Sequence, residues 1–282
     1  MLRFPPSLRL PIGLACTVVL AAGCSADPGP PADDTSASAS NNGRSVVVLG
    51  HSGATGYNSD PADGSRDARG NSWATGTNPA VNSIYQRLQA QSPEYTGHNM
   101  NLAKDGATVD DLLGQAKQAA AAQPPAGIVL IQVVDNDIRC DGTDPDNYDP
   151  FAQTLRTALQ TITQAAPQAR IYMLSQWATV ANYTETIADM PGGPEANTGT
   201  GPCDTFDANR RIRPKAVAYL QDVVDHYHQQ LATVCAAFPT CTYDQGALQK
   251  MTLVPADLSP DLNHLSIDGH RKYAEHAWNA LF

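Results

Sequence analysis

The chain has 282 residues, of which 42% are hydrophobic and 16% are charged, and its formal net charge is −10. Nucleic-acid binding is disfavoured because phosphate contacts need clustered Lys and Arg, whereas this chain has 28 acidic and 18 basic residues. No apolar run reaches the roughly 18–20 residues of a membrane-spanning helix, which disfavours an integral membrane protein. The length suits one or two globular domains.

The first 23 residues have the pattern of an export signal. Two arginines precede an uncharged stretch from Leu10 to Gly23, which is too short to span a bilayer and suits the apolar region of a signal peptide. The residues before Cys24 resemble a bacterial lipobox, although Ala21 stands where Leu is usual. We therefore expect residues 1–23 to be a signal peptide and Cys24 to be lipidated. The alternative is an ordinary secretory signal cleaved close by.

Residues 24–44 are expected to be a flexible linker. The segment 25–43 has no large apolar side chain and is rich in Ser, Pro, Asp, Asn and Gly. Such a segment cannot offset its ordering entropy by burial. No polybasic patch accompanies the expected lipid, so we expect membrane contact through the lipid anchor only. Residues 45–282 then form the folded domain, which no second linker divides.

Four cysteines remain in that domain, at positions 140, 203, 235 and 241. An exported chain folds in an oxidising compartment, so disulfides are expected. We favour Cys235–Cys241, which are close in sequence across a helix-to-strand turn, and Cys140–Cys203, which link two long loops. Free buried thiols are the alternative. Metal binding is disfavoured because no pair has the Cys-x-x-Cys spacing.

Short apolar runs alternate with helix-period patterns after Ser45. Val46–Leu49 is a β-branched run typical of a strand buried on both faces. The patterns predict strands over 46–49, 99–103, 128–134 and 171–174, and helices over 79–90, 109–121, 150–165, 208–237 and 267–281. The Pro- and Gly-rich stretch 190–203 is predicted to be a surface loop. This alternation predicts an α/β fold, a single three-layer α/β/α sandwich with a central, mostly parallel sheet.

Candidate chemical groups follow the predicted strands. Ligands of open parallel sheets bind beyond the carboxyl ends of the strands. Ser52 follows the first strand, Gly106 follows the second and Asn136 follows the third, while Asp261 and His264 form an Asp-x-x-His pair near the C-terminus. A serine hydroxyl becomes a nucleophile when an imidazole accepts its proton, and that imidazole needs an orienting carboxylate. The tetrahedral intermediate needs hydrogen-bond donors for its oxygen. Together these groups indicate acyl transfer.

Four segments resemble the sequence blocks of the SGNH (GDSL-type) hydrolases, over most of residues 45–282. The segments read VVVLGHSGATGY, NLAKDGATVDDL, QVVDNDI and DLNHLSIDGHRKYA. His51 stands where the family usually has Asp, and Val134 where it usually has Gly. These departures bear on substrate preference and rate more than on the fold. The resemblance implies the flavodoxin-like SGNH hydrolase fold.

The resemblance also implies the site residues. Ser52 would be the nucleophile, His264 the general base and Asp261 its orienting partner. The oxyanion hole would consist of the Ser52 and Gly106 backbone N–H groups and the Asn136 side-chain amide. Gly106 could instead be needed only for its backbone conformation.

Three other histidines in or near these segments are expected to have no catalytic role. His51 is expected to face the loops or the solvent, because neighbours along a strand-to-turn segment usually point apart. His270 and His276 compete with His264 as the base, but both fall on the last predicted helix. We expect them to be surface or packing residues.

Other polar and aromatic clusters are weaker candidates. The four aspartates between positions 141 and 149 lack the EF-hand spacing and are expected to form a solvated loop. His226 and His228 are two residues apart and diverge on a helix, which argues against a shared metal. Trp73 and Tyr57 either line an acyl or sugar pocket or make ordinary loop packing.

The sequence therefore predicts an exported serine esterase that cleaves carboxylic esters through an acyl-enzyme on Ser52, without metal or cofactor. A lipid ester or an acylated envelope carbohydrate is the expected substrate, with a mild preference for short acyl groups because no long apolar loop indicates a lid. We expect a monomer that is lipid-anchored on the cell surface or the periplasmic face, or else secreted. The alternative is a catalytically silent or acyl-transferring surface lipoprotein that binds glycans or a partner with the same fold.

Overall fold

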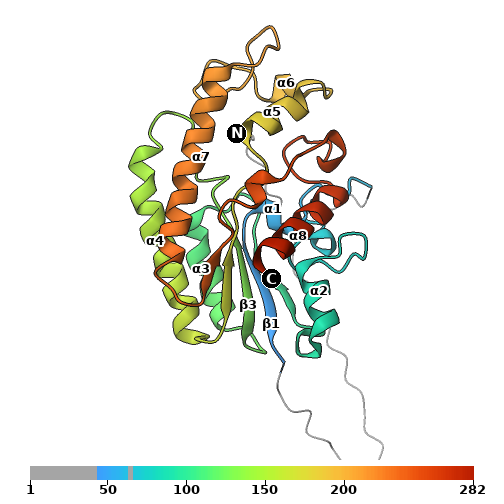
Figure 1. Ribbon diagram of the computed structural model, residues 1–282, viewed down its shortest axis with the longest axis vertical. Coiled ribbons are helices and arrows are strands. Elements are labelled where there is room, and N and C mark those ends of the chain that lie inside the picture. Colours follow the sequence, from blue (N-terminus) through green and yellow to red (C-terminus); the bar gives the residue numbers. More distant parts are fainter. Residues whose placement is uncertain (1–42, 63–65) are drawn as a thin grey trace, which may run out of the picture. The chain divides into compact units, whose positions relative to one another are not determined.

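A five-stranded parallel sheet forms the centre of the computed structural model, which describes residues 43–62 and 66–282 (Figure 1). The expected signal peptide, Cys24 and nearly all of the expected linker lie outside the described residues. Every neighbouring pair of strands is parallel. The strands are β1 (Ser45–Gly50), β2 (Asn99–Asn101), β3 (Ala126–Gln132), β4 (Arg170–Met173) and β5 (Cys241–Tyr243), in the order β2-β1-β3-β4-β5.

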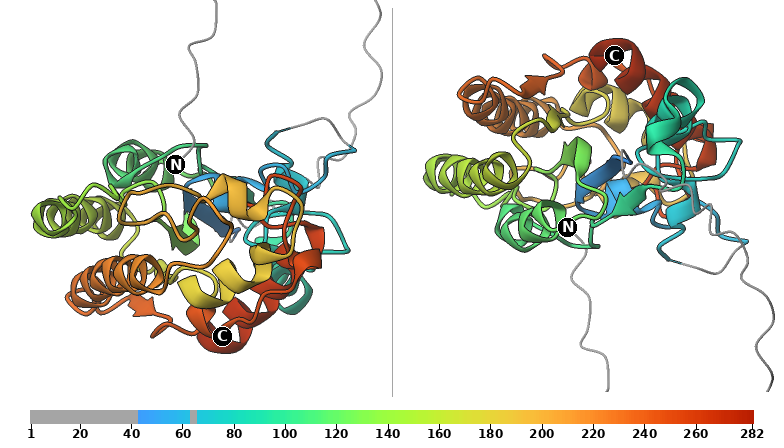
Figure 2. Two further views of the ribbon diagram at one scale, coloured as in Figure 1. Left: turned by 90° about the horizontal axis from the view of Figure 1, so that it is seen from above. Right: turned by 90° about the horizontal axis from the view of Figure 1, so that it is seen from below.

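Helices cover both faces of the sheet, as Figure 2 shows from above and below. One layer holds α3 (Val109–Ala120), α4 (Pro145–Ala165) and α7 (Pro214–Cys235), and the other holds α2 (Ile84–Gln91) and α8 (Ile267–Leu281). Alternate residues of β1 serve the two layers. Val47 and Leu49 pack with α3, α4 and α7, whereas Val46 and Val48 pack with α2 and α8. The alternation accounts for the continuous apolar run, because a strand covered on both faces needs apolar side chains at every position. The predicted three-layer α/β/α fold is confirmed.

Shorter helices complete the domain, and several differ from the sequence predictions. They are α1 (Ser52–Thr55), α5 (Val180–Ala188) and α6 (Gly193–Ala196), with single 3₁₀ turns at 69–71, 93–95, 248–250 and 255–257. No sequence pattern predicted α5, and α6 lies within the stretch expected to be a loop. The helix predicted over 79–90 begins at Ile84, because Ser83 and Gln86 form a capping box that fixes its first turn. Prolines set the starts of α4 and α7, at Pro145 and Pro214.

One disulfide joins two loops and a second joins the end of α7 to the start of β5. The structure contains Cys140–Cys203, with a sequence separation of 63, and Cys235–Cys241, with a separation of 6. This is the pairing that the sequence favoured. Disulfides persist in oxidising compartments, so they are typical of an extracellular or periplasmic protein. Among the described residues, no helix is long and apolar enough to cross a membrane.

The strand order places the topological switch point of the sheet between β1 and β3. The chain moves from β1 to β2 on one side and then returns to β3 on the other, which is the switch point where open α/β sheets bind ligands. Ser52 follows β1 and Asn136 follows β3, so both residues lie at this edge. The fold therefore brings the predicted nucleophile and one predicted oxyanion donor to neighbouring strand ends.

Candidate active site

Ser52, His264 and Asp261 form a continuous hydrogen-bonded chain. His264 Nε2 lies 2.8 Å from Ser52 Oγ, and His264 Nδ1 lies 2.8 Å from Asp261 Oδ2. An ionised carboxylate can only accept, so Nδ1 carries the ring proton and Nε2 accepts from the serine hydroxyl. The contact spans 212 positions in sequence. The arrangement gives Ser52 a base and gives that base an orienting partner, which is the geometry of nucleophilic acyl transfer.

The Asp261 carboxylate accepts hydrogen bonds from several donors besides the His264 ring. Asn58 Nδ2 donates to Oδ2, and Oδ1 accepts from Ser259 Oγ at 2.7 Å and from the backbone N–H groups of Asn263 and His264. Burial alone raises the pKa of Asp261, but the hydrogen bonds from His264, Asn58 and the Asn263 backbone outweigh it and hold that pKa well below its usual range. Asp261 is therefore ionised at any pH at which His264 can act.

The turn that carries Ser52 is fixed by buried amides. Gly50 ends β1 at φ +138°, and a Cβ there would lie 1.9 Å from the Gln132 carbonyl oxygen, so only glycine fits. The buried Gln115 side chain on α3 accepts from the Gly50 N–H at 2.7 Å and donates to the Gly50 carbonyl at 2.9 Å. Behind the turn, the Gln132 side chain accepts from the Trp73 indole N–H at 2.9 Å. Ser52 thus follows a strand end, Gly50, whose N–H and carbonyl groups both bond the Gln115 side chain.

His51 does not face the loops or the solvent, so that expectation was wrong. Its side chain is 1% exposed and acts as the N-cap of α1, where Nδ1 accepts from the Gly53 N–H at 3.1 Å. Its Nε2 lies 3.5 Å from Asp135 Oδ2. Burial lowers the pKa of His51, and the charge of Asp135 opposes that effect only in part. The side chain turns inward because the orphan N–H groups of α1 need an acceptor, as helix starts do.

The two remaining predicted oxyanion donors lie on loops that contact each other. Asn136 Nδ2 donates to the Ala107 carbonyl at 2.9 Å, which joins the turn after β3 to the loop before α3. Gly106 has φ +70° in a turn closed by the Ala107 N–H and the Lys104 carbonyl, and open space surrounds its Cβ direction. The positive φ is by itself a sufficient reason for glycine there. The oxyanion role of Gly106 stays a prediction.

Val134 adopts a backbone conformation that β-branched residues rarely take. Its φ is +118°, and its side chain is fully buried in the core beside α3 and α4. Positive φ at such a residue costs on the order of 1–3 kcal/mol. The turn before Asn136 therefore requires the geometry that glycine adopts freely, which accounts for the glycine usual in the resembling family.

The two aromatic candidates divide between the site and the core. The Tyr57 ring lies 4.6 Å from the His264 ring, and its hydroxyl accepts from Arg66 at 3.0 Å. Trp73 is fully buried, packs against Tyr273 and donates to Gln132. Tyr57 therefore borders the His264 imidazole, whereas Trp73 belongs to the hydrophobic core.

Four other histidines take no part in the hydrogen bond between His264 and the Ser52 hydroxyl. His270 is buried in α8, and burial, with a further contribution from His264, lowers its pKa to about 3. His228 is buried in α7 and its Nε2 accepts from the Gln176 N–H at 2.9 Å, while His226 is exposed and stacks on Tyr148. His276 is half-buried on α8. His270 therefore has a packing setting and His276 a partly exposed one, as the sequence analysis expected for these two.

The acidic stretch 141–149 is only partly a solvated loop. Asp144 is fully buried and accepts from the Arg139 N–H at 2.8 Å and the Cys140 N–H at 3.2 Å, so it organises the disulfide-bonded turn. The expectation of solvation was wrong for this residue, because buried N–H groups need an acceptor. Across residues 43–62 and 66–282, no three His, Cys, Asp or Glu side chains are grouped to hold a metal ion.

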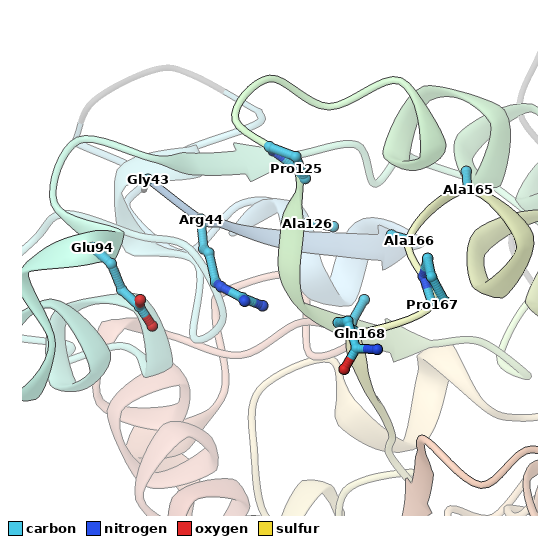
Figure 3. A pocket seen from close by; sticks show the side chains of 10 residues that line it. Gly43, Arg44, Glu94, Pro125, Ala126, Ala165, Ala166, Pro167 and Gln168 are labelled. Carbon is cyan, nitrogen blue, oxygen red and sulfur yellow. The ribbon is translucent and has the colours of Figure 1, made fainter. Parts of the chain in front are cut away.

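A cavity of about 560 Å³ lies away from this site, at the amino ends of the strands (Figure 3). Arg44, Glu94 and Gln168 border it, together with Ala126 at the start of β3. Because the strands are parallel, this edge is opposite the one that carries Ser52. The cavity has no part in the triad.

Sequence reasoning missed the groups that support the triad. Asn58 and Ser259 bond Asp261, and Gln115 bonds Gly50 before Ser52, yet none of the three belongs to a recognisable spacing. Gly269 follows His264 by five residues. A Cβ at this position would lie 2.1 Å from the Asp257 carbonyl oxygen, so glycine lets α8 pack against the 3₁₀ turn at 255–257.

Comparisons with known proteins agree with the geometry. The sequence model of the GDSL-like lipase/acylhydrolase family matches residues 48–272. No curated protein matches the chain. Among solved structures, TesA has a TM-score of 0.53 at 14% identity, over 84% of this chain and 98% of TesA.

Two further solved structures share the fold. Phospholipase A1 from Streptomyces albidoflavus has a TM-score of 0.51 at 14% identity, over 83% of this chain and 98% of its own. The lipase Lip_vut3 from a goat rumen metagenome has a TM-score of 0.50 at 13% identity, over 85% and 98%. At such identities the likeness concerns the fold alone.

Proposed function

The chain belongs to the GDSL-like lipase/acylhydrolase family and is therefore a serine hydrolase that acts on esters, and we propose that Ser52 is its nucleophile. We also propose that this esterase is exported. The observation that carries the proposal is the unbroken series of contacts from Ser52 Oγ through His264 to Asp261, both links at 2.8 Å. A protein that only bound a ligand would need neither the oriented base nor its carboxylate.

The reaction proceeds in two displacement steps. His264 Nε2 takes the Ser52 proton as Oγ attacks the ester carbonyl, and the resulting imidazolium is stabilised by the Asp261 carboxylate. His264 then protonates the departing alcohol, which leaves an acyl group on Ser52. A water molecule, deprotonated by His264, releases the acid and restores the hydroxyl. No metal or cofactor is required for either step.

The oxyanion is held by three donors in this proposal. The backbone N–H groups of Ser52 and Gly106 supply two. Asn136 supplies the third, because one N–H of its amide is fixed on the Ala107 carbonyl at 2.9 Å and an amide has a second N–H to give. Such preorganised donors are typically worth about 3–4 kcal/mol of transition-state stabilisation each.

The substrate is proposed to be a neutral ester, either a lipid ester or an acylated envelope carbohydrate. Asp105, which is exposed, precedes Gly106, and Asp135, whose side chain is 32% exposed, precedes Asn136. Carboxylates beside the oxyanion donors repel an anionic substrate. A neutral ester avoids this repulsion.

The proposal for cellular location follows the sequence. Residues 1–23 direct export, Cys24 carries the lipid, residues 24–44 are the linker and residues 45–282 are the catalytic domain. The two disulfides support folding in an oxidising compartment. Intact-mass analysis of the membrane fraction tests the anchor: an acylated N-terminus at Cys24 supports it, and an unmodified secreted chain contradicts it.

Ester hydrolysis tests the central activity. We expect the purified protein without residues 1–24 to cleave p-nitrophenyl esters, and Ser52→Ala to lose that activity while keeping its melting temperature. Ser92→Ala is the matched control, since Ser92 lies at the C-cap of α2, close to the amino edge of the sheet. Folded wild-type protein that cleaves no ester from acetate to palmitate would count against the proposal.

A further inference from the structure

His51 joins the turn that carries Ser52 to the turn that carries Asn136. Its ring is buried directly before the nucleophile, with Nδ1 on the Gly53 N–H at 3.1 Å and Nε2 facing Asp135 Oδ2 at 3.5 Å. Gly53 belongs to α1, after β1, whereas Asp135 lies in the turn after β3. One side chain thus touches both strand ends at which the chemistry is proposed.

The hydrogen bond to Gly53 determines where the ring proton lies. A ring nitrogen that accepts an N–H has no proton of its own, so the neutral ring carries its proton on Nε2. Asp135 Oδ2 is the nearby carboxylate oxygen, at 3.5 Å, and both His51 Nε2 and Asp135 Oδ1 are buried without a hydrogen-bond partner. The Gly53 backbone packs closely against the ring, since a Cβ added to Gly53 would lie 2.9 Å from His51 Cε1 and 2.7 Å from Gln132 Nε2.

The connection continues from Asp135 to the oxyanion loops. Asp135 precedes Asn136, and the Asn136 amide bonds the Ala107 carbonyl beside Gly106. The turn also contains Val134 at φ +118°. A strained conformation persists only where its surroundings over-determine it, so the turn depends on such contacts.

We propose that His51 is a positioning residue, which as its Nε2–H tautomer holds the Ser52 turn at a fixed distance from the Asn136 turn. This inference rests on the proposed esterase function. His51 touches no reacting atom and acts only through Gly53 and Asp135. Misplacement of reacting groups by about 1 Å lowers rates by about 100-fold, so the connection affects turnover more than substrate affinity.

Three substitutions separate the two contacts. Asn at position 51 can keep an acceptor near the Nδ1 position, Gln can keep a donor near the Nε2 position, and Leu keeps neither. We expect His51→Leu to lower kcat about 100-fold with KM changed less than threefold, and His51→Asn and His51→Gln each to restore part of the loss. Asp141→Asn, on the exposed loop before α4, is the control.

A double substitution tests the Asp135 contact. Asp135→Ala, which removes the acceptor, should lower kcat about as much as His51→Asn, and adding it to His51→Asn should bring little further loss, because the same contact is already broken. Fully additive losses, or wild-type kcat in folded His51→Leu, would overturn the proposal.

NMR spectroscopy tests the positioning role of His51 without an activity measurement. The ¹⁵N shifts of the wild-type His51 ring should report the Nε2–H tautomer, and the Asn136 side-chain amide signals should shift in His51→Leu but not in Asp141→Asn. An Nδ1–H tautomer, or unshifted Asn136 signals, overturns the inference. If the wild type cleaves no ester yet both NMR results hold, the proposed function fails and the His51 connection stands.

Discussion

The buried imidazole of His270 makes the stability of the folded domain fall as the pH falls. Its ring is 1% exposed and its Nδ1 has no hydrogen-bond partner, so its charged form is disfavoured in the folded state. Burial lowers its pKa from 6.5 to about 3. Between these values the unfolded chain binds a proton at His270 and the folded chain does not. Stability is therefore lost as the pH falls below 6.5.

The size of the loss follows from the two pKa values. A difference of one pKa unit corresponds to 1.36 kcal/mol, so the free energy of unfolding decreases by about 2 kcal/mol at pH 5 and by about 3 kcal/mol at pH 4. His51 and His228 also have lowered pKa values and add losses in the same window. The quantity to compare is therefore the difference between wild type and a His270 variant.

Urea unfolding at pH 7.5, 5 and 4 measures this difference. His270→Leu has a similar volume and no titration, so its stability relative to wild type should rise by about 2 kcal/mol from pH 7.5 to 5 and by about 3 kcal/mol from pH 7.5 to 4. His276→Leu, half-buried on the same helix, is the control and should run parallel to wild type. Parallel curves for wild type and His270→Leu would refute the reasoning.

Three further predictions concern stability. Burial raises the pKa of Asp137 to about 7, so the folded state loses stability as the pH rises. The free energy of unfolding of Asp137→Asn should therefore rise by about 4 kcal/mol relative to wild type between pH 4 and 8. A constant difference in urea unfolding would contradict this. At Val134, glycine relieves a strain of about 1–3 kcal/mol that alanine keeps, so Val134→Gly should melt above Val134→Ala although it buries less; the reverse order in thermal melts would show that φ +118° is not strained. Replacing Cys140 and Cys203 by Ser should cost about 4 kcal/mol, because the disulfide closes a separation of 63 residues; a loss below about 1 kcal/mol in urea unfolding would contradict the loop-entropy argument.

The sheet could be predicted because its signal is local. The run Val46–Leu49 and the longer run before Val134 are buried on both faces, so burial appears directly as unbroken apolar sequence. Helix α5 gave no such signal. It is short, and only two of its residues, Thr184 and Ile187, are buried, one of them polar, so no apolar run marks it in the sequence.

The site could be predicted only in part. Ser52, Asp261 and His264 occupy spacings that chemistry restricts, and sequence blocks carry those spacings. His51 was misplaced because its N-cap bond to Gly53 depends on the short helix α1, which no sequence pattern predicted, and only the fold brings it near Asp135, 84 positions away. Gln115 reaches Gly50 across 65 positions for the same reason. Contacts of this kind depend on strand order and register, which local patterns do not encode.

The most direct test of the account is a mass measurement on the serine that it names. Wild-type protein is incubated with a fluorophosphonate, and the modified peptide is identified by mass spectrometry. The account predicts one phosphonyl group per chain, on Ser52, with labelling lost in His264→Ala and retained in His276→Ala. Folded protein that takes up no label, or that is labelled at another serine, would contradict the claim that His264 activates Ser52.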